Sequence, residues 1–550
     1  RYSVQWAGFG IVEGDGEMKI KIPIYHDVWM DNGIENLYKI LCSIQKQERG
    51  ILQTNIESDR LEVEVFNSKR LKELLEDAIR ASRDNYIFYW DEDAKTKVKV
   101  NKKKAFIAIQ YGSKDQRTGR NKVKEKIFRD EEIGQVLGKL LEEFEGGKKE
   151  KTCVLCGRPY HVSISNLHQA VYPFATKIKS LSGVRTKVSP DGVISGMTEN
   201  YKHLCPYCYL VGTLEWADPA IIYRSFTGGK KPDERFSVVL LPSEPNLAKL
   251  KEVKEAYRWQ VEPLAQEKVS NIRVRIRGRE GEQRRPPIAK FTLLLGFLEN
   301  FLRDYAVEKK VLDYYDCRRK ISENWIALEV PEGAVKDVKV YPLIVGNDFL
   351  QLLVTLIEGK HCPYYDFLGP LWLRNSEGKR ADPATQDEVK EELACSLITD
   401  NFDSFAGNFV PRRKTSLVIY PSVKETLEQI IKEWRWHKMG LKEEDLEVIK
   451  KAARVVAKAG ENSPSILYKL ERARGLTELL DALTQVSHKI IGMEAKELQY
   501  LSMDSVERLV EMLHSKGDDP HVFKDLRNTL VIFASVEWGK GTFKGGKVND

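Results

Sequence analysis

The sequence has no long apolar run and no apolar segment at its start. Its longest apolar runs, residues 236–241 and 291–298, fall well short of the roughly 18 residues that a membrane-spanning helix needs. The opening residues, Arg1 to Gln5, lack the apolar stretch of a secretory signal. We therefore expect a cytoplasmic protein with no membrane partner.

Common catalytic motifs are also missing. The sequence contains no Walker loop, no H-E-x-x-H and no G-x-S-x-G. Asp313 and Asp316 have no evident matching carboxylates for a metal, and His361 and Cys362 are adjacent, which is poor geometry for a catalytic pair. We expect a non-catalytic protein. Nuclease chemistry remains an alternative, because acidic metal sites assemble from residues far apart in the chain.

Net charge is only +7 over 550 residues, but the positive charge is concentrated. Residues 101–129 hold ten Lys or Arg against two acidic residues, and residues 268–290 hold eight against two, so the rest of the chain sums to −7. Concentrated positive charge is what binding of a polyanion such as nucleic acid requires, whereas the alternative is an ordinary solvated surface. The many Lys and Glu residues also point to a thermophile.

One basic segment has strand periodicity. Arg273, Arg275 and Arg277 alternate with aliphatic residues, so a strand would place all three guanidinium groups on one face, about 7 Å apart, where they could contact phosphates. The alternative is a solvent-facing stripe balanced by acidic residues on a neighbouring strand. The complete set of candidate nucleic-acid-binding residues is Lys102, Lys103, Lys104, Lys114, Arg117, Arg120, Lys122, Lys124, Lys230, Lys231, Arg273, Arg275, Arg277, Arg279, Arg284 and Arg285.

Hydrophobic periodicity divides the chain into four segments. We predict an N-terminal α+β domain with a basic loop (1–150), a zinc-binding lobe (151–210), an α/β middle region (211–420) and a C-terminal helical bundle (421–550). Predicted helices cover 34–47, 68–82, 130–144, 247–259, 288–307 and 349–356; predicted strands cover 2–12, 19–24, 86–90, 97–111, 236–241, 272–277, 325–330 and 416–420. About six helices are expected in the last segment, with glycines 440, 460, 475, 492, 517 and 539 ending them. The fold class is therefore α+β multidomain with a zinc-binding insertion and an all-helical end.

Four of the eight cysteines form two C-x-x-C pairs, Cys153 with Cys156 and Cys205 with Cys208. Two residues between cysteines allow both thiolates of a turn to face one ion, and two such turns complete a tetrahedral site. Disulfides, a redox C-x-x-C and chance are the competing interpretations. We expect one structural zinc ion. His161 and His203 lie close to the pairs in sequence and could replace a cysteine as a ligand or interact with the ligands without binding the metal.

Two C-x-x-C pairs separated by 48 residues, in a basic α+β protein ending in a helical bundle, resemble one family. It is the large subunit of type I CRISPR Cascade, in the subtypes that carry a CXXC–CXXC signature; type I-A fits best and type I-B next. The motif covers only residues 153–208. The remaining resemblance lies in domain order, length and Lys/Glu-rich character.

The resemblance implies a non-catalytic subunit of an RNA-guided surveillance complex in antiviral defence. Such a subunit binds the guide RNA complex and the target DNA. Its tasks are PAM recognition on the duplex, retention of the displaced strand and provision of a docking surface for the helicase–nuclease. Guide RNA then reads the sequence, while the protein supplies PAM and backbone contacts. The residues that match the family's cysteine motif are Cys153, Cys156, Cys205 and Cys208. No motif identifies which residues of this chain would read the PAM.

Two other classes of function stay open. One is a zinc-containing nuclease or recombinase acting on DNA, which would cleave DNA in a divalent-metal-dependent reaction. The other is an RNA-binding or ribosome-associated factor, which would prefer structured RNA to a PAM-bearing duplex.

Overall fold

A computed structural model describes most of the chain. The described residues are 18–84, 86–91, 96–101, 110–114, 121–125, 130–144, 151–162, 172–174, 187–188, 194–195, 204–215, 218, 221–226, 236–266, 290–331, 338–375, 379–381, 383–411, 416–419, 421–436, 440–461, 463–493 and 503–541. The chain divides into two compact units. Unit 1 is Arg1–Arg275 with Arg319–Leu343, and unit 2 is Ile276–Arg318 with Ile344–Asp550. The four predicted segments are not tested by this division and stay predictions.

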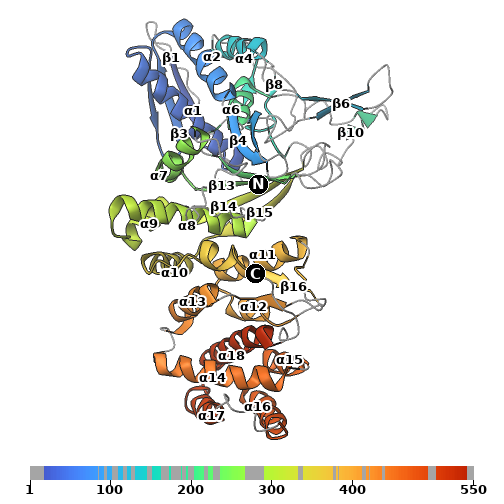
Figure 1. Cartoon of the computed structure of the whole chain (residues 1–550). Helices are drawn as coiled ribbons and strands as arrows, with labels where there is room; N and C mark the ends of the chain where they lie inside the picture. The colour runs from blue at the N-terminus through green and yellow to red at the C-terminus, as the bar shows by residue number, and fades with distance from the viewer. Residues whose placement is uncertain are drawn as a thin grey trace. The chain divides into compact units, whose positions relative to one another are not determined.

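A three-stranded antiparallel sheet begins unit 1 (Figure 1). Its strands are β1 (Met18–Pro23), β2 (Leu52–Ile56) and β3 (Arg60–Val65), in the order β1-β3-β2. Apolar side chains alternate with charged ones, so that Ile20, Ile22 and Leu61 face the core. On the other face, Lys19 and Lys21 form ion pairs with their cross-strand partners Glu64 and Glu62.

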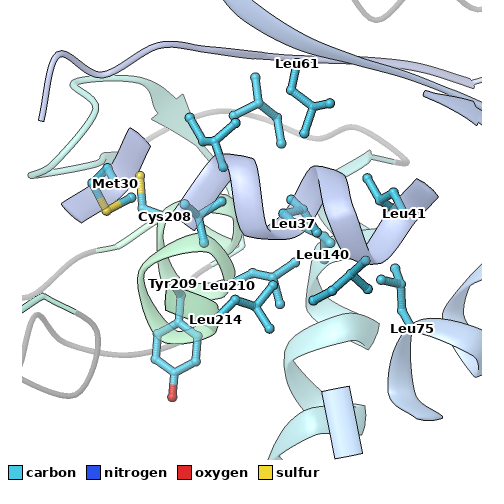
Figure 2. Close-up of a cluster of buried hydrophobic side chains, with 14 of the residues drawn as sticks. Met30, Leu37, Leu41, Leu61, Leu75, Leu140, Cys208, Tyr209, Leu210 and Leu214 are labelled. Carbon is cyan, nitrogen blue, oxygen red and sulfur yellow. The ribbon is translucent and has the colours of Figure 1, made fainter. Parts of the chain in front are cut away.

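Four helices pack into the same apolar core: α1 (Val28–Gln47), α2 (Ser68–Asp84), α4 (Asp130–Phe144) and α6 (Pro206–Glu215). Figure 2 shows leucines of α1, α4 and α6 meeting in this core. The predicted helices over 34–47, 68–82 and 130–144 are confirmed, but α1 starts six residues earlier than predicted. Asp27 caps it by accepting hydrogen bonds from the backbone N–H groups of Trp29 and Met30.

Helix α1 approaches α6 closely at Gly33. A Cβ added at Gly33 would lie 2.5 Å from the carbonyl oxygen of Val211, a backbone atom that cannot rotate away. Gly33→Ala is therefore expected to destabilise the protein by about 1–3 kcal/mol, despite the better helix propensity of alanine. Denaturant unfolding of the full chain measures this effect.

The matched control is Gly138→Ala on α4, where the added Cβ meets only the flexible end of Lys72, at 3.9 Å. This variant should be neutral or up to about 1 kcal/mol more stable than the wild type. Equal unfolding free energies for the two variants would contradict a close contact between α1 and α6.

The rest of unit 1 contains a four-stranded sheet and smaller hairpins. The sheet has the order β12 (Ile222–Phe226), β13 (Phe236–Pro242), β14 (Asn324–Pro331) and β15 (Lys339–Ile344), and α7 (Leu247–Gln266) follows β13. The two-stranded hairpins are β4 (Tyr86–Asp91) with β5 (Thr96–Asn101), β6 (Gln110–Lys114) with β7 (Asn121–Glu125), β8 (Lys151–Thr152) with β9 (Pro159–Tyr160), and β10 (Lys187–Val188) with β11 (Ile194–Ser195). Residues 2–12 and 272–277, predicted as strands, lie outside the described residues.

Unit 2 is mainly helical. Its first part comprises α8 (Lys290–Lys309), α9 (Tyr314–Lys320, whose last two residues belong to unit 1), α10 (Asn347–Glu358), the π-helix η3 (Pro363–Leu368), α11 (Pro383–Ile398), α12 (Phe402–Gly407) and the hairpin of β16 (Trp372–Arg374) with β17 (Ser416–Val418). The buried carboxylate of Glu299 on α8 accepts hydrogen bonds from the backbone N–H groups of Tyr364 and Tyr365 at the start of η3. Burial raises the pKa of Glu299 to about 8, although these hydrogen bonds oppose the shift.

The C-terminal part is helical, as predicted. It comprises α13 (Pro421–Ile431), η4 (Lys432–Trp436), α14 (Glu443–Ala459), α15 (Ser465–Arg472), α16 (Leu476–Ile491), α17 (Asp504–Lys516) and α18 (Pro520–Gly541), with α18 packed along α14 (Figure 1). Gly460, Gly492 and Gly517 end helices as predicted. Gly475 instead precedes α16, and Gly539 lies within α18, where an added Cβ would meet the carbonyl oxygen of Leu417 at 2.9 Å. None of the helices in the described part of the chain is long and apolar enough to cross a bilayer.

Candidate metal centre

The first cysteine pair lies in a short hairpin between β8 and β9. The N–H of Gly157 donates to the carbonyl of Cys153 over 2.8 Å, and the N–H of Cys153 donates to the carbonyl of Arg158 over 2.8 Å. Gly157 has φ +69°, a left-handed conformation that glycine adopts without steric cost. The resulting tight turn places Cys153 and Cys156 near each other and buries both.

The second pair is built differently, because it begins a helix. Cys205 directly precedes Pro206, the first residue of α6, and Cys208 lies in the first turn. The N–H of Cys208 points to the sulfur of Cys205, 3.4 Å away. Proline suits a first helical position, and the positive end of a helix dipole favours thiolates. The second pair needs no following glycine, because the start of a helix rather than a tight turn brings its cysteines together.

The four sulfurs form one compact cluster. All Sγ atoms lie within 4.8 Å of one another, and those of Cys156 and Cys205 are 3.7 Å apart. Four thiolates around a single tetrahedral zinc, with Zn–S bonds of about 2.3 Å, would lie about 3.8 Å apart. The observed spacing therefore fits one mononuclear ion, whereas an iron–sulfur cluster would need room for its inorganic core between the cysteines. All four side chains are buried.

Without a cation, these thiols strongly perturb one another. Hydrogen bonds from the other three cysteines, led by Cys156, lower the pKa of Cys153. Burial, followed by the neighbouring sulfurs, raises the pKa of Cys205 and of Cys208 well above the ordinary value. Four thiolates so close together in a buried position would repel one another, and a divalent cation is the group that would stabilise them.

Side chains around the cluster attach it to α1. The hydroxyl of Tyr25 lies 3.2 Å from the sulfur of Cys208, and the indole N–H of Trp29 donates to the carbonyl of Gly212 on α6 over 2.9 Å. Figure 2 shows Cys208 in the same group of buried side chains as Met30 of α1. The metal centre is therefore continuous with the apolar core of unit 1.

Two histidines near the pairs were considered as replacement ligands. His161 has its Nδ1 3.0 Å from a carboxylate oxygen of Glu143 and its Nε2 2.9 Å from the carbonyl of Glu142, both on α4. It is not a member of the four-residue cluster. His203, the other residue considered as a replacement ligand, lies outside the described residues.

A buried ion network elsewhere in unit 1 was not predicted from the sequence. Lys254 of α7 has its Nζ 2.5 Å from Asp218, 3.0 Å from Glu35 and 3.9 Å from Glu215, and all four side chains are at most 1% exposed. Burial lowers the pKa of Lys254, but the carboxylates of Asp218, Glu215 and Glu35 more than offset this and raise it above its ordinary value. The sequence does contain a sign of this buried charge, because Lys254 falls between Leu250 and Tyr257 on the apolar face of its helix.

The basic residues predicted to bind nucleic acid lie mostly outside the described part of the chain. The structure places Lys114, Lys122 and Lys124 in the β6–β7 hairpin, where Ser113 pairs with Lys122 and Tyr111 with Lys124. The predictions outside the described residues are Lys102, Lys103, Lys104, Arg117, Arg120, Lys230, Lys231, Arg273, Arg275, Arg277, Arg279, Arg284 and Arg285.

Comparison with known proteins adds no relative. No protein-family model matches the chain, and no curated protein matches it. The four-cysteine cluster and the mixed helix-and-sheet architecture are therefore the features from which a function has to be argued.

Proposed function

We propose that this chain is the non-catalytic large subunit of a type I CRISPR RNA-guided surveillance complex, stabilised by one structural zinc ion. The observation that carries the proposal is the assembly of two C-x-x-C pairs, with 48 residues between them in sequence, into one buried four-sulfur cluster. The cysteines behind the family resemblance thus come together in space, and four thiolates are a ligand set that structural zinc takes.

The position of the cluster suits a structural role. Its four sulfurs are enclosed, and the cluster joins the β8–β9 hairpin to the start of α6. Closed four-thiolate sites stabilise folds, whereas catalytic zinc sites keep a position for water or substrate. A zinc ion here would fix the segment between Cys156 and Cys205 at both of its ends.

Nucleic-acid binding in this proposal rests on charge. The window 101–129 has a local charge of +8 and contains the β6–β7 hairpin with Lys114, Lys122 and Lys124; the window 268–290 has +6. Segments of this kind supply phosphate contacts that do not depend on sequence. We propose that they bind PAM-bearing duplex and displaced strand, and that the charge-neutral helices after residue 420 help recruit the helicase–nuclease.

Purification of the tagged full-length chain from its native host tests the assignment. Sequencing of the co-purified RNA and mass spectrometry of the co-purified proteins are the readouts. We expect short RNAs of uniform repeat–spacer form together with several partner subunits. Heterogeneous RNA, or none, would reject the CRISPR assignment, and metal-dependent cleavage of DNA by the isolated chain would favour the nuclease alternative.

The arginine stripe has its own test. Changing Arg273, Arg275 and Arg277 together to Glu is expected to weaken binding to a forked DNA duplex and to flatten its salt dependence. The slope of log K against log salt should become shallower by about 0.9 for each phosphate that the protein no longer neutralises. Fluorescence anisotropy at several salt concentrations measures both effects.

The control carries the same charge change on exposed side chains of the C-terminal helices. Lys451, Arg454 and Lys489, changed together to Glu, should leave both affinity and slope close to wild type. If the two triple variants lose affinity equally, the effect is one of net charge, and the stripe is not a binding site.

A further inference from the structure

Tyr25 contacts the candidate metal centre from outside the cysteine motif. It lies between β1 and α1, far from the cysteines in sequence, and its hydroxyl oxygen is 3.2 Å from the sulfur of Cys208. The guanidinium of Arg158, in the hairpin that carries the first cysteine pair, lies 5.9 Å from the centre of the Tyr25 ring. The tyrosine therefore contacts a cysteine of the second pair and lies near an arginine of the hairpin that carries the first.

The backbone of Tyr25 is held in place by the cap of α1. Its N–H donates to Asp31 Oδ1 over 2.7 Å, and the N–H of Asp27 donates to Asp31 Oδ2 over 3.0 Å. Asp27 in turn accepts hydrogen bonds from the first turn of α1 and from the hydroxyl of Tyr172. The ring is thus positioned by a hydrogen-bonded turn.

The direction of the Tyr25–Cys208 hydrogen bond follows from the chemistry of a metal ligand. A zinc-bound cysteine is a thiolate and has no proton to donate, so the tyrosine O–H is the donor when the site holds a metal. Hydrogen bonds to ligating groups orient them and tune the metal, and their removal typically weakens metal binding.

We propose that Tyr25 is a positioning residue of the metal centre, donating its O–H to the metal-bound sulfur of Cys208 and thereby making this sulfur less nucleophilic. The inference rests on the metal binding proposed above. It makes the start of α1 part of the centre, so that the site is built from three separate segments of the chain. It also gives a role to the hydroxyl of Tyr25, whose ring is partly buried against the core of unit 1.

The test is Tyr25→Phe in the full-length chain. Zinc affinity, measured by competition with a chromophoric chelator, should fall roughly 10- to 100-fold. With cobalt(II) in place of zinc, the sulfur-to-cobalt charge-transfer band should shift to lower energy, because a thiolate without this hydrogen bond gives up its electrons more easily. A purely structural role for Tyr25 would not move this band.

Reactivity towards iodoacetamide gives a third readout. The sulfur electron pair forms the new S–C bond while the C–I bond breaks and iodide leaves with its electron pair. Zinc release under this reagent should be faster in Tyr25→Phe than in wild type, because the sulfur lone pairs are then freer to react.

Tyr341→Phe is the matched control. Tyr341 also lies in unit 1, and its hydroxyl contacts Glu329 at 3.2 Å rather than a cysteine. It should keep wild-type zinc affinity, cobalt spectrum and rate of zinc release. Wild-type values of all three in Tyr25→Phe would overturn the inference while leaving the metal site intact, whereas a wild-type chain that binds no metal would reject the site itself.

Discussion

Replacing Cys205 and Cys208 together by serine is expected to abolish metal binding and to lower the thermal stability of the chain more than any other change considered. Structural zinc contributes apparent binding free energies of about 10–16 kcal/mol in small zinc peptides. The effect on folding here is smaller, because unit 1 has a large apolar core of its own. Elemental analysis should give one zinc per wild-type chain and none in the variant, with a lower melting temperature.

Cys42 and Cys395 provide the control for that experiment. Both are half-buried and neither belongs to the four-sulfur cluster. Replacing both by serine should leave one zinc bound. Freshly purified wild-type protein without metal, or a Cys205/Cys208 variant that keeps its zinc, would contradict the proposed centre.

Lys254→Met should have the second largest effect. The substitution keeps most of the side-chain volume but leaves Glu35, Glu215 and Asp218 buried beside an apolar group in place of a cation. Breaking a buried ion pair by removing one partner typically costs about 3–5 kcal/mol, since the remaining charge can neither be solvated nor neutralised easily. Denaturant unfolding monitored by circular dichroism would measure the destabilisation.

Lys251→Met, one turn away on α7, is the matched comparison. Its Nζ lies 5.4 Å from the centre of the Tyr38 ring, and its side chain is only partly buried. Removal of a cation–π interaction of this kind costs about 0.5–1 kcal/mol. If the two methionine variants were equally stable, the network around Lys254 would not contribute as its geometry indicates.

The sequence predicted best where a signal is local. The C-x-x-C spacing identified the four residues that the structure brings together, because each pair requires only a turn or the start of a helix. Helices with strong periodicity, such as α2 and α4, were predicted nearly to their ends. The cysteine cluster and most of the predicted helices and strands that fall on described residues are confirmed, while the identity of the ion stays a proposal.

Non-local arrangements could not be predicted in the same way. The start of α1 that the prediction missed contains Asp31 and Asn32, both buried, so no apolar stripe marked it as helical. Glu35 and Asn36, also buried, follow within the predicted range. Their partners come from elsewhere in unit 1: Asn36 donates to the carbonyl of Leu214, and Lys254 neutralises Glu35. Tyr25 was missed for the same reason, because nothing near it in sequence signals a sulfur.

The pairing of β13 with β14 has a consequence for synthesis of the chain. Residues 276–318, which lie between these strands in sequence, belong to unit 2. During synthesis, β13 therefore leaves the ribosome before its partner strand β14, and residues 276–318 of unit 2 are made in between. Those residues in turn cannot pack fully until the rest of unit 2, from residue 344 onward, has been made. Neither unit can be completed before synthesis of the other has begun. A nascent chain halted between residues 276 and 323 would expose the unpaired edge of β13, a site where chaperones could bind.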